Sequence, residues 1–487
     1  MRAKGAVLTL GLALLAGPLT AQPSGGDARL AHTIEAQALG LVEFARERED
    51  LCFAEAELRL ALEVLPGSTA LGEALATVER EVARAEADST LIRAFSSAHM
   101  RLLAAEQARV HEAISLALAR AASEADDEAR ARYLQGILRC YPSEAANAFL
   151  DMEYFEPLRR WVPRADLAVL REGGDYHEGE LLSPASVAAL NSRHASWKDP
   201  WVFSDEVHEL RTTVPLRQAK QLLVFLGAYR AFFLARFGDA WDLRTPSGKL
   251  PVIVTRTQAE LQDQLRRAAR ERGVPTGGQE RELGVAFYLH TGGTLDPCFA
   301  TYEPKDTAGN VFTIPWDEPE QLELALAHEL THQIAFEYSK HAARRSRPVR
   351  YQYWAVEGIA SFMCQHLYER GSFILRLERQ LRWGERVAEP PFAYCKRTLA
   401  SLPTLRAFVG RSRAQCLNAE SYQMGATLAY FLLEGEDGKY RGRFVKLLQT
   451  VHRQFDTRDS FDKAFAGVEP DTLQAEWERF VAGLPLR

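Results

Sequence analysis

The segment from residue 317 to 338 constrains the fold more than any other part of the chain. The letters DEPE at residues 317–320 predict a capping-box start for a helix that runs through QLELALAHELTHQIAFEY. His328 and His332 lie four residues apart on it, so both imidazoles project from one face, within reach of a single ion. Glu329 follows the first histidine, where it can accept a proton from metal-bound water. A histidine pair that only packs on a helix face is the alternative.

A second apolar helix is expected from Tyr353 to Met363 (YWAVEGIASFM), and it carries one acid, Glu357. An isolated carboxylate among Ala, Val, Ile and Phe is costly to bury unless a cation meets it, and Zn²⁺ meets that need. Glu357 is therefore the expected third ligand, with an exposed helix-surface acid as the alternative. His366 competes for this role, but nine residues beyond Glu357 it would point to the opposite face of a helix.

The motif HELTHQ is followed by the pattern W-x-x-E-G-x-A, whose Glu lies 25 residues after His332. Together the two motifs resemble the gluzincins. This superfamily includes thermolysin and aminopeptidase N, and the likeness is greatest to peptidase MA-like domains that follow helical repeats in exported bacterial proteins. The resemblance covers roughly residues 207–481, and it implies that Glu357 is the third ligand of one Zn²⁺ ion. The metzincin pattern is excluded because Ala335 and Tyr338 stand where it requires Gly and His.

Residues 421–430 (SYQMGATLAY) are similar to the Y-x-x-G helix of aminopeptidase-N-like enzymes. In that family the tyrosine hydroxyl donates to the tetrahedral oxyanion, a role that the resemblance gives to Tyr422. Without the family, a single tyrosine on an apolar helix is more often a core residue than a catalytic one. The stretch Gly284–Tyr288 (GVAFY) keeps the glycine of the family's G-x-M-E-N block but lacks its acid, which argues against cleavage guided by a free amine. It is expected to be the edge strand that pairs with the substrate backbone.

These residues predict a zinc metallopeptidase that cleaves a peptide or protein substrate, as an endopeptidase or a carboxyl-directed peptidase. Glu329 would take a proton from water and deliver it to the leaving amine, while Tyr422 and the metal share the developing charge. Two other functions stay open. One is a catalytically inactive gluzincin-like protein that binds a protein partner through its helical repeats, and the other is a zinc hydrolase of non-peptide substrates.

The chain outside this region is organised in three parts. Residues 28–150 are rich in Ala, Leu, Glu and Arg with helical periodicity, and the echo between 58–71 and 133–146 resembles tetratricopeptide-type hairpins. A plain helical bundle is the alternative. Residues 151–204 lack sustained periodicity and are expected to be a linker. Residues 205–487 are expected to form the gluzincin domain.

Strands and helices alternate at the start of that last part. Strands are expected at 207–214, 250–255, 284–289 and 310–314, and helices at 216–237 and 258–272, followed by an almost entirely helical C-terminal part. The expected fold class is thus α+β and mostly helical, with a small mixed sheet.

The first 21 residues have the pattern of a signal peptide, with Arg2 and Lys4 before an apolar run from Gly5 to Ala16 and a small residue, Ala21, at the cleavage point. Export to the periplasm or the medium is expected, with no membrane span after removal of the signal. The formal net charge of -6 argues against a nucleic-acid partner. The 6 cysteines lack CxxC spacing, and Cys395 with Cys416 is the disulfide pair to test first.

Overall fold

The computed structural model describes residues 25–48, 50–87, 97–125, 129–130, 133–134, 136–137, 140–141, 143, 146, 151–238, 240–273, 285–290, 295–305, 310–339, 349, 351–369, 371–380, 382–383, 386–387, 389–453 and 456–486. They form two compact units, an N-terminal unit that extends to Pro184 and a C-terminal unit from Ala185 onwards. The expected signal peptide, residues 1–21, lies outside the described residues. None of the described helices has both the length and the apolar character needed to cross a bilayer.

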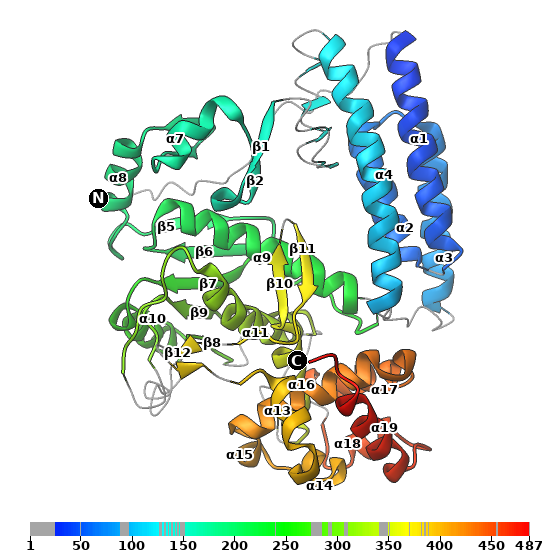
Figure 1. Ribbon diagram of the computed structural model, residues 1–487, viewed down its shortest axis with the longest axis vertical. Coiled ribbons are helices and arrows are strands. Elements are labelled where there is room, and N and C mark those ends of the chain that lie inside the picture. The colour runs from blue at the N-terminus through cyan, green and yellow to red at the C-terminus, as the bar shows by residue number, and fades with distance from the viewer. Residues whose placement is uncertain are drawn as a thin grey trace. The chain divides into compact units, whose positions relative to one another are not determined.

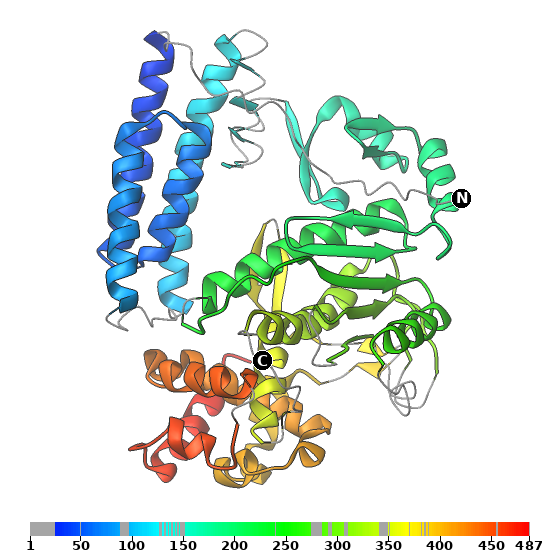
Figure 2. The same ribbon diagram turned by 180° about the vertical axis from the view of Figure 1, so that it is seen from behind.

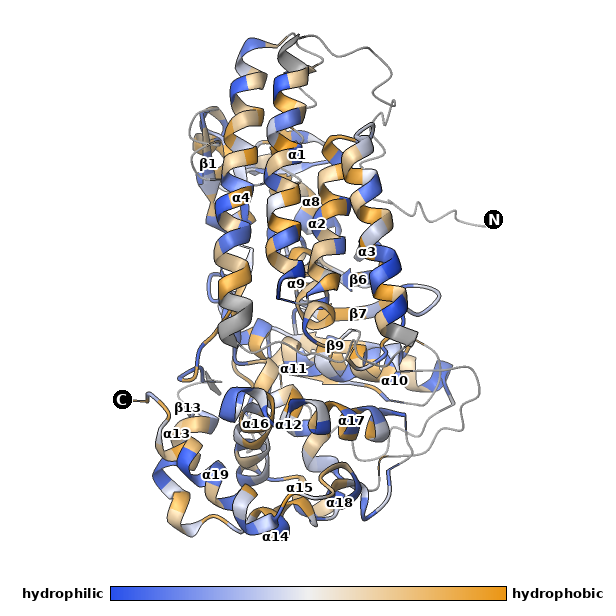
Figure 3. Ribbon diagram, turned by 90° about the vertical axis from the view of Figure 1, so that its right-hand side faces the viewer, coloured by the Kyte–Doolittle hydropathy of each residue, from blue (hydrophilic) through white to orange (hydrophobic). Residues whose placement is uncertain are grey.

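The N-terminal unit begins with long helices, as the periodicity of residues 28–150 predicts (Figure 1). Their bounds are α1 Gly25–Arg46, α2 Leu51–Val64, α3 Thr69–Ala87 and α4 Ser97–Glu124. Helix α2 starts at Asp50 because this side chain accepts a hydrogen bond from the backbone N–H of Phe53 at 3.0 Å. Helix α1 packs on α2 and α4. Apolar and polar residues alternate along all four helices, so each buries one stripe (Figure 3).

The segment expected to be a linker, residues 151–204, contains short helices and strands, and the division between the two units falls inside it, after Pro184. Its elements are β1 Met152–Phe155, η1 Glu156–Leu158, β2 Arg160–Pro163, η2 Arg164–Asp166, α7 Leu167–Arg171, β3 Asp175–His177, β4 Glu180–Leu182, α8 Pro184–Arg193 and β5 Trp201–Ser204. Strands β1 and β2 form one hairpin, and β3 and β4 form another. Both are very short, so they show little of the alternation by which a strand is recognised.

The C-terminal unit contains a five-stranded mixed sheet (Figure 2). Its strand order is β5-β6-β7-β9-β8, with β6 His208–Thr212, β7 Leu250–Thr255, β9 Cys298–Thr301 and β8 Ala286–Tyr288. Strands β6, β7 and β9 are parallel, and β5 and β8 are antiparallel to their neighbours at the two edges. The stretch 284–289 was expected to be an edge strand, and β8 confirms this for residues 286–288.

Helices cover both faces of the sheet. Helix α10 (Gln258–Glu271) buries Leu261 and Leu265 in one cluster with Phe299 of β9. Helices α9 (Leu216–Phe237) and α11 (Pro319–Tyr338) pack on each other, α9 against β5 and β6 and α11 against β8 and β9. Helix α11 therefore covers β9 and β8, the two strands at one end of the sheet.

The rest of the unit is helical apart from two short hairpins, β10 His366–Glu369 with β11 Ser372–Leu375 and β12 Arg382–Trp383 with β13 Arg386–Val387. Helix α12 (Tyr353–Met363) packs against both α11 and α16. The remaining elements are α13 Pro391–Thr398, η4 Leu399–Ser401, α14 Leu405–Val409, α15 Arg413–Cys416, α16 Ala419–Glu434, η5 Gly435–Gly438, α17 Arg441–His452, α18 Ser460–Ala464 and α19 Pro470–Ala482. The expected α+β, mostly helical fold class is confirmed.

Two local predictions were wrong. The residues expected to form a strand at 310–314 make only an isolated bridge, between Val311 and Lys305. The sheet includes β9 in place of this expected strand. The capping box expected at 317–320 is absent, because the N-cap of α11 is Glu318 and its side chain makes no cap hydrogen bond. Pro319 at the first turn begins this helix instead, since its φ is already helical and it has no N–H to satisfy.

Candidate metal centre

The side chains of His328, His332 and Glu357 meet at one point between α11 and α12. The Nε2 atoms of His328 and His332 are 3.2 Å apart, and Oε2 of Glu357 lies 3.1 Å from the first and 3.4 Å from the second. Among the described residues, this is the group of metal-ligating side chains whose donor atoms converge closely enough to hold an ion. The structure thus brings together all three residues that the sequence predicts as ligands.

The spacing of these three atoms fits a zinc ion. Ligand atoms bound tetrahedrally at about 2.0–2.1 Å stand about 3.3 Å from one another, because the edge of a tetrahedron is about 1.6 times its centre-to-corner distance. The three observed separations lie within about 0.2 Å of that value. Two imidazole nitrogens and one carboxylate oxygen are also a donor set that zinc prefers, and three ligands leave a fourth position open.

Local sequence explains why these side chains converge. One turn of helix separates the two histidines of α11, and α12 lies across this helix with Glu357 in its middle. His332 is 7% exposed and Glu357 is 6% exposed, while His328 is partly exposed. The carboxylate is buried, as the sequence predicts, and not on the helix surface.

The electrostatics of the cluster follow from this burial. Burial alone would raise the pKa of Glu357, but the two histidines hold it well below the ordinary value. Burial would likewise lower the pKa of His328, yet hydrogen bonds with Cys364 and Glu357 and the charges of the two carboxylates raise it well above the ordinary value. The cluster therefore favours a bound positive charge.

Glu329 lies beside the cluster and is held by the edge strand. Its Oε2 accepts a hydrogen bond from the backbone N–H of Tyr288 in β8 at 2.7 Å. Burial, opposed by the two histidines, raises its pKa above the ordinary value. A carboxylate with a raised pKa next to an open metal position is suited to accept and return a proton.

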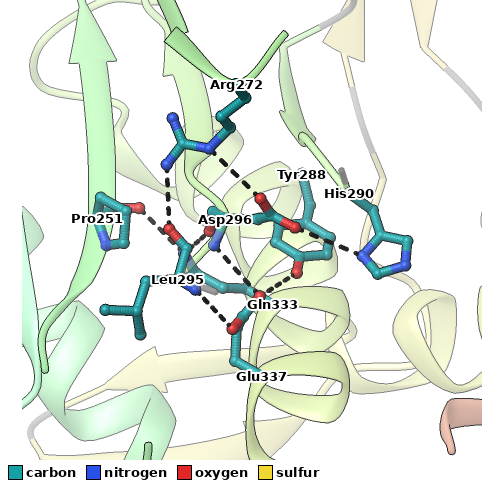
Figure 4. A network of polar contacts seen from close by, with 8 residues as sticks. All are labelled: Pro251, Arg272, Tyr288, His290, Leu295, Asp296, Gln333 and Glu337. Atoms are coloured by element: carbon teal, nitrogen blue, oxygen red, sulfur yellow. Dashed lines mark hydrogen bonds and ion pairs between the residues drawn. The ribbon is translucent and has the colours of Figure 1, made fainter. Parts of the chain in front are cut away.

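A network of polar contacts fixes β8 to the end of α11 (Figure 4). The hydroxyl of Tyr288 donates to Oε1 of Glu337 at 2.7 Å, and the backbone N–H of Leu295 donates to Oε2 at 2.9 Å. Gln333 donates through Nε2 to the carbonyls of Pro251 and Asp296, both at 3.0 Å. Glu337 is thus a second buried acid on α11 whose two oxygens already accept from protein donors. The sequence analysis missed this network, which joins segments far apart in the chain.

Tyr422 lies on α16 with its ring centroid 6.2 Å from that of His328. Burial and the nearby charges of Glu357 and Glu329 raise its pKa, so the hydroxyl keeps its proton. A close crossing of two helices sets this position. A Cβ on Gly358 would stand 2.6 Å from the carbonyl oxygen of Gly425, so only glycine lets α12 and α16 approach so closely.

Other residues that the sequence singled out lie away from the cluster. His366 is buried in β10, with Nδ1 3.0 Å from the carbonyl of Met363, and takes no part in the cluster, as expected. Cys395 and Cys416 are both free thiols in this structure, so the suggested disulfide is not formed. Gly284 lies outside the described residues.

Comparisons of the chain with known protein families, with curated proteins and with solved structures found no match. The case for a function therefore depends on the residues and geometry of this chain alone.

Proposed function

We propose that this chain is an exported zinc metallopeptidase that hydrolyses peptide bonds with Glu329 as the general base. The observation that carries the proposal is the triangle of His328 Nε2, His332 Nε2 and Glu357 Oε2, with sides of 3.1 to 3.4 Å. A bound zinc ion would supply a Lewis acid and a water whose pKa is lowered to about 7. The signal-like pattern of residues 1–21 supports export.

Glu329 moves the proton in this proposal. It takes a proton from the attacking water and delivers it to the nitrogen of the leaving amine. Burial raises the pKa of this carboxyl, which makes it a stronger proton acceptor than an exposed glutamate, and the N–H of Tyr288 holds one of its oxygens in place.

Tyr422 stabilises the oxyanion that develops when the carbonyl is attacked. Because its raised pKa keeps the hydroxyl protonated, it donates a hydrogen bond to that oxygen and takes on no charge itself. The hydroxyl contributes most in the transition state, where the negative charge is greatest.

Strand β8 orients the substrate. The N–H of Leu289 donates to Pro297 and the N–H of Thr301 donates to the carbonyl of Val285, so the odd-numbered residues of this strand bond to β9. The backbone groups of Ala286 and Tyr288 consequently face away from β9. The N–H of Tyr288 already donates to Glu329 and its carbonyl accepts from the N–H of His290, so an extended peptide pairs with the backbone groups of Ala286.

The test is metal analysis of purified protein together with turnover of a mixed peptide library, with and without a chelator. Wild-type protein should bind one zinc per chain and cleave peptides, and the chelator should stop cleavage. Glu329→Gln should keep the zinc and lose roughly 10²- to 10⁴-fold in turnover, the contribution of a positioned base. Zinc binding without cleavage of any peptide would sink the proposal and favour a binding protein or a hydrolase of other substrates.

A further inference from the structure

Arg413 lies beside the candidate metal centre without being part of it. It opens α15, which packs against α12, and its guanidinium carbon is 4.9 Å from the centroid of the Tyr353 ring. Tyr353 precedes Glu357 by four residues on α12, so the two side chains lie on one face of that helix. A single tyrosine ring therefore separates this arginine from the ligand carboxylate.

The charge of Arg413 also reaches both tyrosines of the site. Tyr353 lies under its guanidinium, and an electrostatic interaction links Arg413 with Tyr422 as well. The guanidinium thus acts on two tyrosines that lie beside the ligand carboxylate of Glu357.

Unlike its neighbours, Arg413 has no carboxylate within ion-pair distance in the part of the chain that the structure describes. Arg411, two residues earlier, donates to Glu420 and to Ser421, each at 2.8 Å. Arg397 pairs with Glu389, and Arg376 pairs with Glu369. Arg413 is exposed and its guanidinium lies over an aromatic ring, which steadies this group and leaves N–H donors for an external acceptor.

The charges of the site favour a carboxylate as the acceptor that Arg413 binds. A zinc ion would be offset by the two carboxylates Glu329 and Glu357, and Arg413 then adds a positive charge beside the Tyr353 ring. A planar guanidinium with free N–H groups binds a carboxylate through two parallel hydrogen bonds.

We propose that Arg413 binds a carboxylate of the peptide substrate and thereby selects peptides with an acid close to the scissile bond. This inference rests on the proposed function. The acid has two sources, the α-carboxylate at the end of a peptide and the side chain of Asp or Glu. The first makes the protein a carboxyl-directed peptidase, and the second makes it an endopeptidase with acidic specificity.

Binding to the full chain, zinc-loaded and carrying Glu329→Gln, separates these sources without turnover. The probes are three libraries of N-acetyl pentapeptides: one with free C-termini, one with the same sequences amidated, and one with every Asp and Glu replaced by Asn and Gln. Retention measured by mass spectrometry should favour one carboxylate source by about tenfold or more, the scale of a charge-assisted hydrogen bond. Arg413→Gln, introduced into the Glu329→Gln chain, should abolish the preference. Arg413→Lys in the same chain should leave part of it, because lysine keeps the charge without the planar fork.

Arg406→Gln is the matched control, since Arg406 is an exposed arginine on α14 and its loss removes the same charge. It should leave the preference intact. Absence of any preference, absence of peptide binding, or a preference that survives Arg413→Gln overturns the inference. Cleavage by the chain without Glu329→Gln is scored separately. An Arg413-dependent preference without cleavage would therefore refute the proposed peptidase and leave the carboxylate subsite standing.

Discussion

The two units of this chain each bury a glutamate against histidine, and the two clusters differ in how the carboxylate oxygens are matched with hydrogen-bond donors. In the N-terminal unit, Glu57 is 6% exposed, and its Oε1 lies 2.5 Å from Nε2 of Gln107 and its Oε2 lies 2.7 Å from Nε2 of His111. Each oxygen thus has its own donor. This arrangement is complete as a set of hydrogen bonds.

The cluster in the C-terminal unit is different, because one oxygen of Glu357 faces two nitrogens that also face each other. His328 Nε2 and His332 Nε2 are 3.2 Å apart, and both lie within 3.4 Å of Oε2. Protons cannot satisfy all three contacts in the neutral tautomers, since each imidazole then has one N–H to give. A cation satisfies all three atoms at once. Burial of a Glu–His pair is therefore weak evidence for a metal, and convergence of lone pairs is strong evidence.

The same substitution in the two clusters tests this difference, and we expect its largest effect at Glu357. Glu357→Gln removes a charged ligand and should weaken zinc binding by more than the 10–100-fold that follows loss of an outer-shell partner, with turnover lost in parallel. Zinc titration and metal analysis of the full chain measure the effect. Retention of zinc at wild-type affinity would remove the distinction between the clusters.

The second expected effect is at Tyr422. Tyr422→Phe should lower kcat by about 10²–10³-fold, the value of one oxyanion donor, while KM and zinc content stay unchanged. Steady-state kinetics on a cleaved peptide measure this. Tyr430→Phe is the control, since Tyr430 lies on the same helix with its ring stacked on Phe362. Equal losses in both variants would assign Tyr422 to the core.

The sequence was sufficient where a pattern is local. The periodicity of 216–237, 250–255 and 353–363 predicted α9, β7 and α12 at their observed bounds. The four-residue spacing of the histidines needs only helical geometry, and the apolar surroundings of Glu357 needed only the cost of a buried charge.

The sequence was insufficient where contacts join distant segments or elements are short. Strand β9 has four residues directly after Pro297, all of them buried, so no alternation marks it. The stack of Arg413 on Tyr353 and the bond from Tyr288 to Glu337 link residues at least 49 positions apart. Only tertiary packing creates such neighbours.

The buried His366 sharpens the comparison, because the positive charge of Arg236 acts on it where the other two clusters have a carboxylate. Burial and this positive charge lower the pKa of His366 to about 3, below the ordinary value near 6.5. The unfolded chain therefore binds more protons between these pH values, so stability falls as the pH is lowered through them. At pH 5 the expected cost is about 2 kcal/mol relative to neutral pH.

Urea unfolding of the C-terminal unit at pH 5 and 7, followed by tryptophan fluorescence, measures this cost. His366→Phe removes the titrating group and should reduce the stability difference between the two pH values by about 2 kcal/mol. The aromatic ring suits a site between Phe232 and Phe362. An unchanged difference would mean that His366 titrates normally.

The smallest effect is expected at the N-terminal cluster, and it completes the comparison. Glu57→Gln keeps the shape, removes the charge and turns one of the two acceptor oxygens into an NH₂ donor, which the other tautomer of His111 accepts; it should cost about 1 kcal/mol, the difference between charged and neutral hydrogen bonds. Hydrogen exchange in α2 and α4, which carry Glu57 and His111, reports that loss locally. Zinc content and peptide turnover should stay at wild-type values. If Glu57→Gln lowered the zinc content as Glu357→Gln does, a Glu–His contact alone would suffice to bind metal here, and the convergence of three donor atoms would lose its meaning as a criterion.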